Sequence, residues 1–406
     1  MLIGKTKNKI WFLSIISLYI ILFLIGSETF MISPILPVIA SDLNVEIEHA
    51  AYAITAYVLA YAIAAPFMAY IADRIGHGIA LLFGVGVFML GNIIATQSVH
   101  LMDLVVARGI GGLGGAFAGP AIWALIVKIS PTDVRSGAIG LGMASFSLGQ
   151  VIGVPVGTLM AVSFGWRTAF AAIACLSAFS LLGAVITRVG AASSHAIHDE
   201  QSAASENYHK GILAPWRGKK TALTLITTIL FQMSSLGAYS YLGVILSKSG
   251  LSFGEKDLGT IGIAVGIGSV LGSILAGRLS DQARKRALNE AGRIPVWSAL
   301  LIASLIMMTL VIENSNALSG LAAIFIIVIW FISSGAFVTD SQAIVTGALP
   351  EARALASAWN ITSMYIGTAM GVSLLGCFTF SWGTLLGISA IPAALSIFSS
   401  IALIRA

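Results

Sequence analysis

Apolar runs long enough to cross a membrane recur along the whole chain, and they constrain its fold more than any other feature. A hydrocarbon core about 30 Å thick takes about 20 apolar residues of helix. Runs of this kind cover roughly 11–40, 50–72, 79–97, 102–129, 136–164, 167–188, 220–248, 256–279, 295–313, 318–348, 354–380 and 383–404. The sequence therefore predicts an all-α membrane protein with twelve transmembrane helices.

Composition supports this class. Only 10% of the residues are charged and 57% are hydrophobic, whereas a soluble domain carries about 25% charged residues. The one long polar stretch is 189–219, which has the composition of a flexible linker. Three histidines in it fit no defined metal spacing. We therefore expect an N-terminal six-helix bundle at 1–188, a cytoplasmic linker, and a C-terminal six-helix bundle at 220–406.

The distribution of basic residues predicts the orientation. If the N-terminus is cytoplasmic, Arg108 is intramembrane, and the Lys and Arg residues on the outer side are Arg167, Lys248 and Lys256. All other Lys and Arg residues then fall at cytoplasmic ends, as the positive-inside rule requires. Both termini are expected in the cytoplasm, in the inner membrane. The net charge of +5 is thereby explained without a nucleic-acid partner.

One arginine lies in the middle of a glycine-rich apolar run, Leu104–Pro120. On a helix Arg108 shares a face with Gly112, Gly115 and Gly119, so a second helix can approach this backbone closely. A cation at mid-membrane costs about 2.5 to 3.5 kcal/mol, and such residues are usually functional and paired. Arg108 therefore needs an acidic partner.

Two acids lie within predicted spans. Glu28 is midway along the first span, and Asp340 is in the tenth. Glu28 is interpreted either as a proton carrier or as half of a permanent salt bridge to Arg108. Since buried ion pairs stabilise proteins poorly, proton coupling is favoured. Asp340 is a second proton site, a counter-charge for a cationic substrate, or a solvated residue near the cytoplasmic end.

Small residues form stripes on two further spans. Gly149, Gly153 and Gly157 recur every four residues on the fifth span, where Pro155 interrupts the hydrogen-bond ladder. The eighth span carries Gly262, Gly266, Ser269, Ser273 and Ala276. Both stripes predict smooth helix faces that allow close packing.

The second half of the chain repeats the first weakly. Asp281 follows the eighth span as Asp73 follows the second, and the stripe at Gly367 and Gly371 corresponds to that at Gly149 and Gly153. Internal repeats of this kind are typical of secondary transporters, whose binding site lies near the midplane between the halves.

These motifs resemble those of the major facilitator superfamily, in particular its twelve-helix drug:proton antiporters such as arabinose-efflux and chloramphenicol-efflux permeases. Asp73, Arg74 and Gly76 match the signature between the second and third helices, and Arg108 with Gly112 match the signature of the fourth. The glycine stripe of the fifth span resembles the antiporter signature.

The resemblance implies a fold of two pseudo-repeated six-helix bundles in which helices 1, 4, 7 and 10 line a cavity. It implies that Glu28 carries the proton and that Arg108 is its partner. It also implies that the stripes on the fifth and eighth helices form the interface along which the two halves rock.

Five aromatic residues are candidates for substrate contact. They are Phe30, Tyr239, Tyr241, Trp330 and Phe337. Each taken alone is more often used in ordinary packing, in the core or against lipid.

The sequence thus predicts a monomeric exporter that exchanges an external proton for a small cytoplasmic solute such as a drug, sugar or nucleoside. Its energy source is the proton gradient, and no cofactor is expected. No nucleophile and base pair or metal-ligand cluster stands out, so enzyme activity is not expected. Two alternatives remain open: a proton-coupled importer of sugars or nucleosides, and a membrane sensor or partner subunit that transports nothing.

Overall fold

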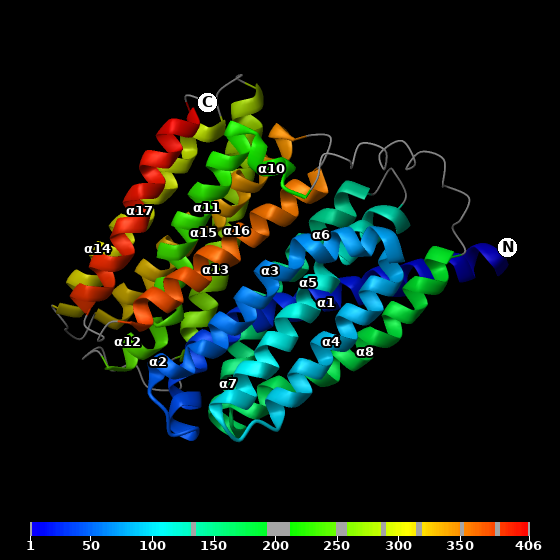
Figure 1. Cartoon of the computed structure of the whole chain (residues 1–406), viewed down its shortest axis with the longest axis horizontal. Helices are drawn as coiled ribbons and strands as arrows, with labels where there is room; N and C mark the ends of the chain where they lie inside the picture. The colour runs from blue at the N-terminus through cyan, green and yellow to red at the C-terminus, as the bar shows by residue number, and fades with distance from the viewer. Residues whose placement is uncertain are drawn as a thin grey trace.

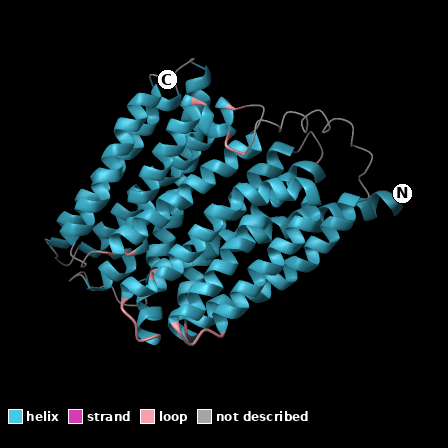
Figure 2. Ribbon diagram, viewed as in Figure 1, coloured by secondary structure: helices cyan, strands magenta, loops and turns pink. Residues whose placement is uncertain are grey.

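The computed structural model describes residues 2–130, 135–192, 212–248, 258–285, 290–313, 319–349, 353–377 and 382–404. Every regular element in these ranges is helical (Figure 2). The first half contains α1 (Leu2–Asp42), α2 (Ile47–Ala50), α3 (Tyr52–Ile75), α4 (His77–Thr96), α5 (Leu101–Ile129), α6 (Arg135–Leu148), the π-helical turn η1 (Gly149–Gly153), α7 (Val154–Phe164) and α8 (Trp166–Ala192). The second half contains α10 (Ala214–Arg217), α11 (Lys219–Ser240), α12 (Leu242–Lys248), α13 (Leu258–Lys285), η5 (Glu290–Arg293), α14 (Ile294–Glu313), α15 (Ser319–Ala348), α16 (Arg353–Gly376) and α17 (Trp382–Ile404).

Ten of the described helices are long and apolar enough to cross a membrane. α16 and α17, with 24 and 23 residues, are each about 35 Å long and are the other two long helices in the described ranges. Large apolar side chains also cover the outside of the molecule, where lipid would contact them, among them Phe67, Phe83, Phe325 and Phe398. The protein is a multi-pass membrane protein, and twelve spans are compatible with this architecture.

The helices form two bundles that lie side by side (Figure 1). Helices α1 to α8 make up one bundle and α10 to α17 the other. In both bundles a glycine allows the fourth long helix to touch the second. A Cβ on Gly112 of α5 would overlap the backbone of Tyr57 in α3, and a Cβ on Gly335 of α15 would overlap the backbone of Ser269 in α13. This shared packing agrees with the repeat in the sequence.

The segment expected as a linker is partly helical. α8 continues to Ala192, and α10 lies just before α11. Trp359 of α16 donates from Nε1 to the backbone oxygen of Ile212 at 2.6 Å, and its ring meets that of Trp216 with centroids 5.5 Å apart. The end of the expected linker therefore packs on the second bundle, and residues 193–211 lie outside the described ranges.

Gly76 has a structural reason to be glycine. It joins α3 to α4 with a φ of 88°, a backbone conformation that residues with a Cβ rarely adopt. Asp73 and Arg74 lie in the last turn of α3, and Asp281 lies in α13. The side chains of these three residues are outside the described part of the structure.

The expectation that Gly149, Gly153 and Gly157 face the other half of the protein is wrong. A Cβ at any of these positions would overlap α1, at Phe23, Ser27 and Met31 respectively. The stripe therefore brings α1 close to η1 and α7 within the first bundle. Together α6, η1 and α7 form the fifth long helix of the chain, called helix five below.

The contact between the halves uses the opposite face of helix five. A Cβ on Gly266 of α13 would overlap Val151, and one on Gly262 would press against Val154 and Pro155. Val151 lies two residues from both Gly149 and Gly153, so it projects from the other side of the helix. Gly262 and Gly266 of α13 thus take the expected position. Ser273 of the same stripe instead donates to the backbone oxygen of Gly335 in α15 at 3.3 Å, within the second bundle.

A pair of alanine substitutions on α5 tests the glycine packing. Gly112→Ala should lower the free energy of unfolding by about 1 to 3 kcal/mol, because the new methyl group overlaps the α3 backbone. Gly109→Ala is the matched control, because nothing lies within 4 Å of a Cβ there. Thermal unfolding of both purified variants in detergent measures the difference. Equal midpoints would contradict the close contact between α3 and α5.

Candidate functional site

The structure brings Glu28 of α1 and Arg108 of α5 into direct contact. Arg108 donates from Nη1 to Glu28 Oε1, and its Nη2 lies 3.5 Å from the backbone oxygen of Glu28. The two residues are 1% and 2% exposed. Arg108 thus has the acidic partner that a buried cation requires.

Asn92 of α4 is the third member of this site. Its Nδ2 donates to Glu28 Oε2 at 2.8 Å and to the backbone oxygen of Phe88 at 2.9 Å. Asn92 was not among the site residues predicted from the sequence. The available signal was a single buried amide within an apolar helix, which is costly unless it is hydrogen-bonded.

An aromatic ring completes the surroundings of the arginine. The Arg108 guanidinium carbon lies 4.2 Å from the ring centroid of Tyr57 in α3, within range of a cation–π interaction. Gly111 leaves room for the carboxylate, since a Cβ there would be 3.1 Å from Glu28 Oε1. Three buried polar atoms at this site have no hydrogen-bond partner in the described structure: Asn92 Oδ1, Arg108 Nε and the Tyr57 hydroxyl oxygen.

A cavity lies next to this site, between the two bundles. Its walls come from α1, α3, α11 and α16. Six lining residues carry hydroxyl groups, namely Thr29, Ser33, Tyr239, Ser240, Tyr365 and Thr368. Four are apolar, namely Phe30, Ile54, Val58 and Leu236. Because Thr29 follows Glu28 directly on α1, the cavity and the ion pair share one helix.

Contacts across this cavity join the bundles. Ser33 of α1 donates to the backbone oxygen of Tyr239 in α11 at 2.6 Å, and the Tyr239 hydroxyl lies 3.4 Å from the backbone oxygen of Phe30. The hydroxyl groups of Thr29 and Tyr365 are 3.5 Å apart. Of the five aromatic candidates, Phe30 and Tyr239 therefore line the cavity, whereas Tyr365 was missed.

The other three aromatic candidates are used in packing within the second bundle. The Tyr241 hydroxyl donates to the backbone oxygen of Val372 at 2.9 Å. Trp330 donates from Nε1 to Ser235 Oγ at 2.9 Å. Phe337 stacks on Phe231 with ring centroids 3.8 Å apart. None of the three is among the residues that line the cavity.

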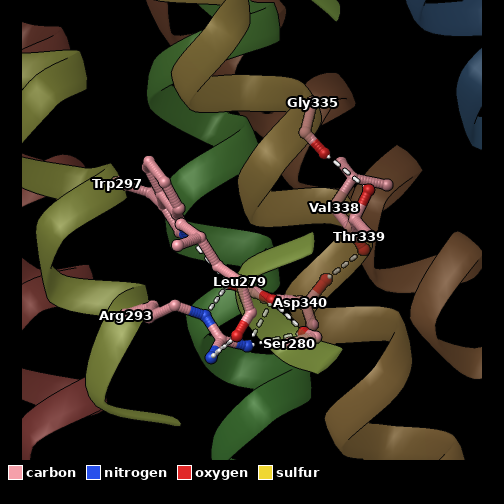
Figure 3. A network of polar contacts seen from close by, with 9 residues as sticks. Leu279, Ser280, Arg293, Trp297, Gly335, Val338, Thr339 and Asp340 are labelled. Carbon is pink, nitrogen blue, oxygen red and sulfur yellow. Dashed lines mark hydrogen bonds and ion pairs between the residues drawn. The ribbon is translucent and has the colours of Figure 1, made fainter. Parts of the chain in front are cut away.

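Asp340 lies in a separate network inside the second bundle (Figure 3). Arg293 donates to its two carboxylate oxygens at 3.0 and 2.8 Å, a bidentate arrangement. Trp297 of α14 donates at 2.8 Å and Ser280 of α13 at 3.0 Å. Asp340 is 0% exposed, so the interpretation of a solvated residue is wrong. The carboxylate joins α13, α14 and α15.

Replacing Asp340 tests this network. Asp340→Asn should lower the free energy of unfolding by about 3 to 5 kcal/mol, because it leaves Arg293 without its buried counter-charge. Changing both residues, as Asp340→Leu with Arg293→Met, should recover much of that loss. Glu46→Gln, at a carboxylate whose side chain is 77% exposed, serves as the control. The thermal unfolding midpoint of each purified variant measures the effect. An unchanged midpoint for Asp340→Asn would show that the network does not hold the three helices together.

Comparison with known proteins assigns this architecture to a family. The family model described as "Major Facilitator Superfamily" matches residues 18–339. The chain is similar to the "Uncharacterized MFS-type transporter YceJ" of Bacillus subtilis (strain 168), with 26% identity over 401 residues that cover 96% of this chain and 94% of the relative. It is similar to a "Chloramphenicol resistance protein" of Streptomyces lividans, with 26% identity over 281 residues that cover 68% of this chain and 69% of the relative.

A solved structure confirms the fold. The "Crystal structure of D-xylose-proton symporter" matches with a TM-score of 0.75 over 95% of this chain and 97% of the other, at 13% sequence identity. At that identity the likeness concerns the fold alone. From the family match, the relatives and the two-bundle helical fold together, the chain belongs to the major facilitator superfamily and is a membrane transporter, not an enzyme.

Proposed function

We propose that the protein is an exporter that exchanges an external proton for a small cytoplasmic solute by alternating access. The observation that carries this proposal is the buried ion pair of Glu28 and Arg108, which lies next to a cavity between the two bundles. We place the protein in the inner membrane with both termini in the cytoplasm. It acts as a monomer, because each chain contains both walls of the cavity, and the proton gradient drives it without a cofactor.

The surroundings of Glu28 suit a carboxyl group that exists in two protonation states. When Glu28 is ionised, it accepts hydrogen bonds from Arg108 and from Asn92 Nδ2. When it is protonated, rotation of the Asn92 amide would present Oδ1, which has no partner in the described structure, as an acceptor for the new proton. Arg108 would keep its contact with the Tyr57 ring. Asn92 can therefore hydrogen-bond Glu28 in both states, whereas Arg108 has its counter-charge only when Glu28 is ionised.

Export is favoured over import by two observations. The run containing Gly149, Gly153 and Gly157 resembles the antiporter signature, and one relative is named a chloramphenicol resistance protein. Drugs, sugars and nucleosides remain the solutes to be tested. We assign Asp340 a structural role, since its two oxygens already accept hydrogen bonds from Arg293, Trp297 and Ser280.

Proton flux in liposomes tests the proposal. Purified protein is reconstituted with an internal pH dye and given chloramphenicol, sugars and nucleosides under an imposed pH gradient. Glu28→Gln should abolish solute-dependent proton flux while the protein remains folded, because the amide cannot release a proton. Glu46→Gln should retain wild-type flux. Solute-driven flux that survives in Glu28→Gln would remove Glu28 from the mechanism.

The same assay separates the remaining alternatives. Solute and protons moving in the same direction would identify an importer. If the Asp340→Asn variant folds but loses solute-coupled proton flux, Asp340 takes part in proton transport. A folded wild-type protein that moves neither solute nor protons would favour the sensor interpretation.

A further inference from the structure

Two side chains from different bundles each bind the backbone of the other bundle. Ser33 of α1 donates from Oγ to the backbone oxygen of Tyr239 in α11 at 2.6 Å, and the Tyr239 hydroxyl donates to the backbone oxygen of Phe30 at 3.4 Å. All three residues are buried. They lie in the half of α1 that ends at Asp42, which the proposed orientation places toward the outside. Both hydrogen bonds therefore require α1 and α11 to stay close in this outer half.

Both acceptors are carbonyl groups that lack a donor within their own helix. Pro34 lies four residues after Phe30 within α1 and has no N–H, so the backbone oxygen of Phe30 loses its helical donor. Tyr239 lies in the last turn of α11, which ends at Ser240, and the last four carbonyl groups of a helix have no donor within it. Each bundle thus offers such a carbonyl group to a hydroxyl group of the other.

A glycine brings the two backbones together beside these bonds. A Cβ on Gly243 of α12 would lie 3.2 Å from the backbone oxygens of Ser33 and Pro34. On the other side, the rings of Phe30 and Tyr239 face each other with centroids 6.2 Å apart. Close backbone packing, ring contact and two hydrogen bonds thus occur at one place between the bundles.

We propose that Ser33, Tyr239 and the backbone oxygen of Phe30 form a latch that holds the outer halves of the two bundles together, and that Pro34 frees the Phe30 acceptor for it. Opening toward the outside separates α1 from α11, so both hydrogen bonds must break in that step. The strength of the latch therefore sets how often the outer side opens. The inference rests on alternating access in the proposed function.

Distances between spin labels on the two bundles test the latch. Labels are attached to cysteines at Met102 and Leu321, after Cys175 and Cys377 have been replaced. Both labelled positions are exposed, in the first turns of α5 and α15, which the proposed orientation places at the outer ends. Double electron–electron resonance in nanodiscs, without solute or pH gradient, gives the ratio of long to short distances. Tyr239→Phe should raise this ratio about fivefold, because one hydrogen bond across the bundles is lost.

A tyrosine two residues away provides the matched control. The Tyr241 hydroxyl bonds the backbone oxygen of Val372 within the second bundle, so Tyr241→Phe should leave the ratio unchanged. A second pair of labels, at the exposed positions Lys128 and Arg278 near the ends of α5 and α13, reports on the opposite end of the bundles. This distance should not lengthen in Tyr239→Phe, whereas a general loosening of the fold would lengthen or broaden both distances and overturn the proposal.

Two further variants assign the parts of the latch. Ser33→Ala removes the other hydrogen bond and should raise the ratio by itself. Pro34→Ala restores an N–H that can bond the Phe30 oxygen within α1, so it should act in the same direction as Tyr239→Phe. Because these last two changes remove the same bond, the double variant should shift the ratio no further than the larger single change. Additive effects would overturn the role of Pro34, and an unchanged ratio in folded Tyr239→Phe and Ser33→Ala would overturn the latch.

These measurements fail independently of the export hypothesis, because they use neither solute nor a proton gradient. The expected shifts in a protein without solute-driven proton flux would contradict antiport alone. Unchanged distances in a protein whose proton flux depends on Glu28 would contradict the latch and leave antiport intact.

Discussion

A cation within a membrane-spanning helix requires an anion beside it, and the first bundle is organised around this requirement. Arg108 and Glu28 lie on helices that are distant in sequence, so α1 and α5 must pack closely where these residues meet. α4 contributes Asn92 to the carboxylate, and α3 contributes the Tyr57 ring to the guanidinium. Four helices thus converge on one charge pair, and the cavity lies on the adjoining face of α1.

Glycine makes this convergence possible. Gly111 leaves space for the Glu28 carboxylate, and Gly112 brings the Tyr57 backbone within reach of α5. Without a side chain at these positions, backbones approach closely, and van der Waals contact replaces the hydrophobic effect that lipid does not supply between helices. The second bundle instead joins its helices through Asp340, which is surrounded by donors from η5, α13 and α14. The two bundles share a fold but are held together by different polar groups.

The sequence correctly predicted the features that depend on local residue pattern and on charge, namely the helices and the buried ion pair. Apolar runs located the helices, and the cost of a buried charge indicated that Arg108 and Glu28 form a pair. Helical period shows which residues share a face but not which neighbour that face meets, so the stripe of helix five was assigned to the wrong partner. The Asp340 network was missed because Arg293 is 47 residues away and counted as one of many cytoplasmic basic residues. Tyr365 could not be chosen, since one hydroxyl among many buried polar groups gives no signal in the sequence.

Glu28 and Thr29 are consecutive on α1 and face different parts of the protein. Glu28 points to Arg108 and Asn92 in its own bundle, and Thr29 meets Tyr365 of the other. Successive residues on an α-helix are separated by about 100° around its axis, and the helix holds that angle fixed. Any axial rotation of α1 must therefore move the carboxylate and the hydroxyl together. A rotation of α1 that changes the Glu28–Arg108 contact in one bundle therefore also changes the Thr29–Tyr365 contact with the other bundle.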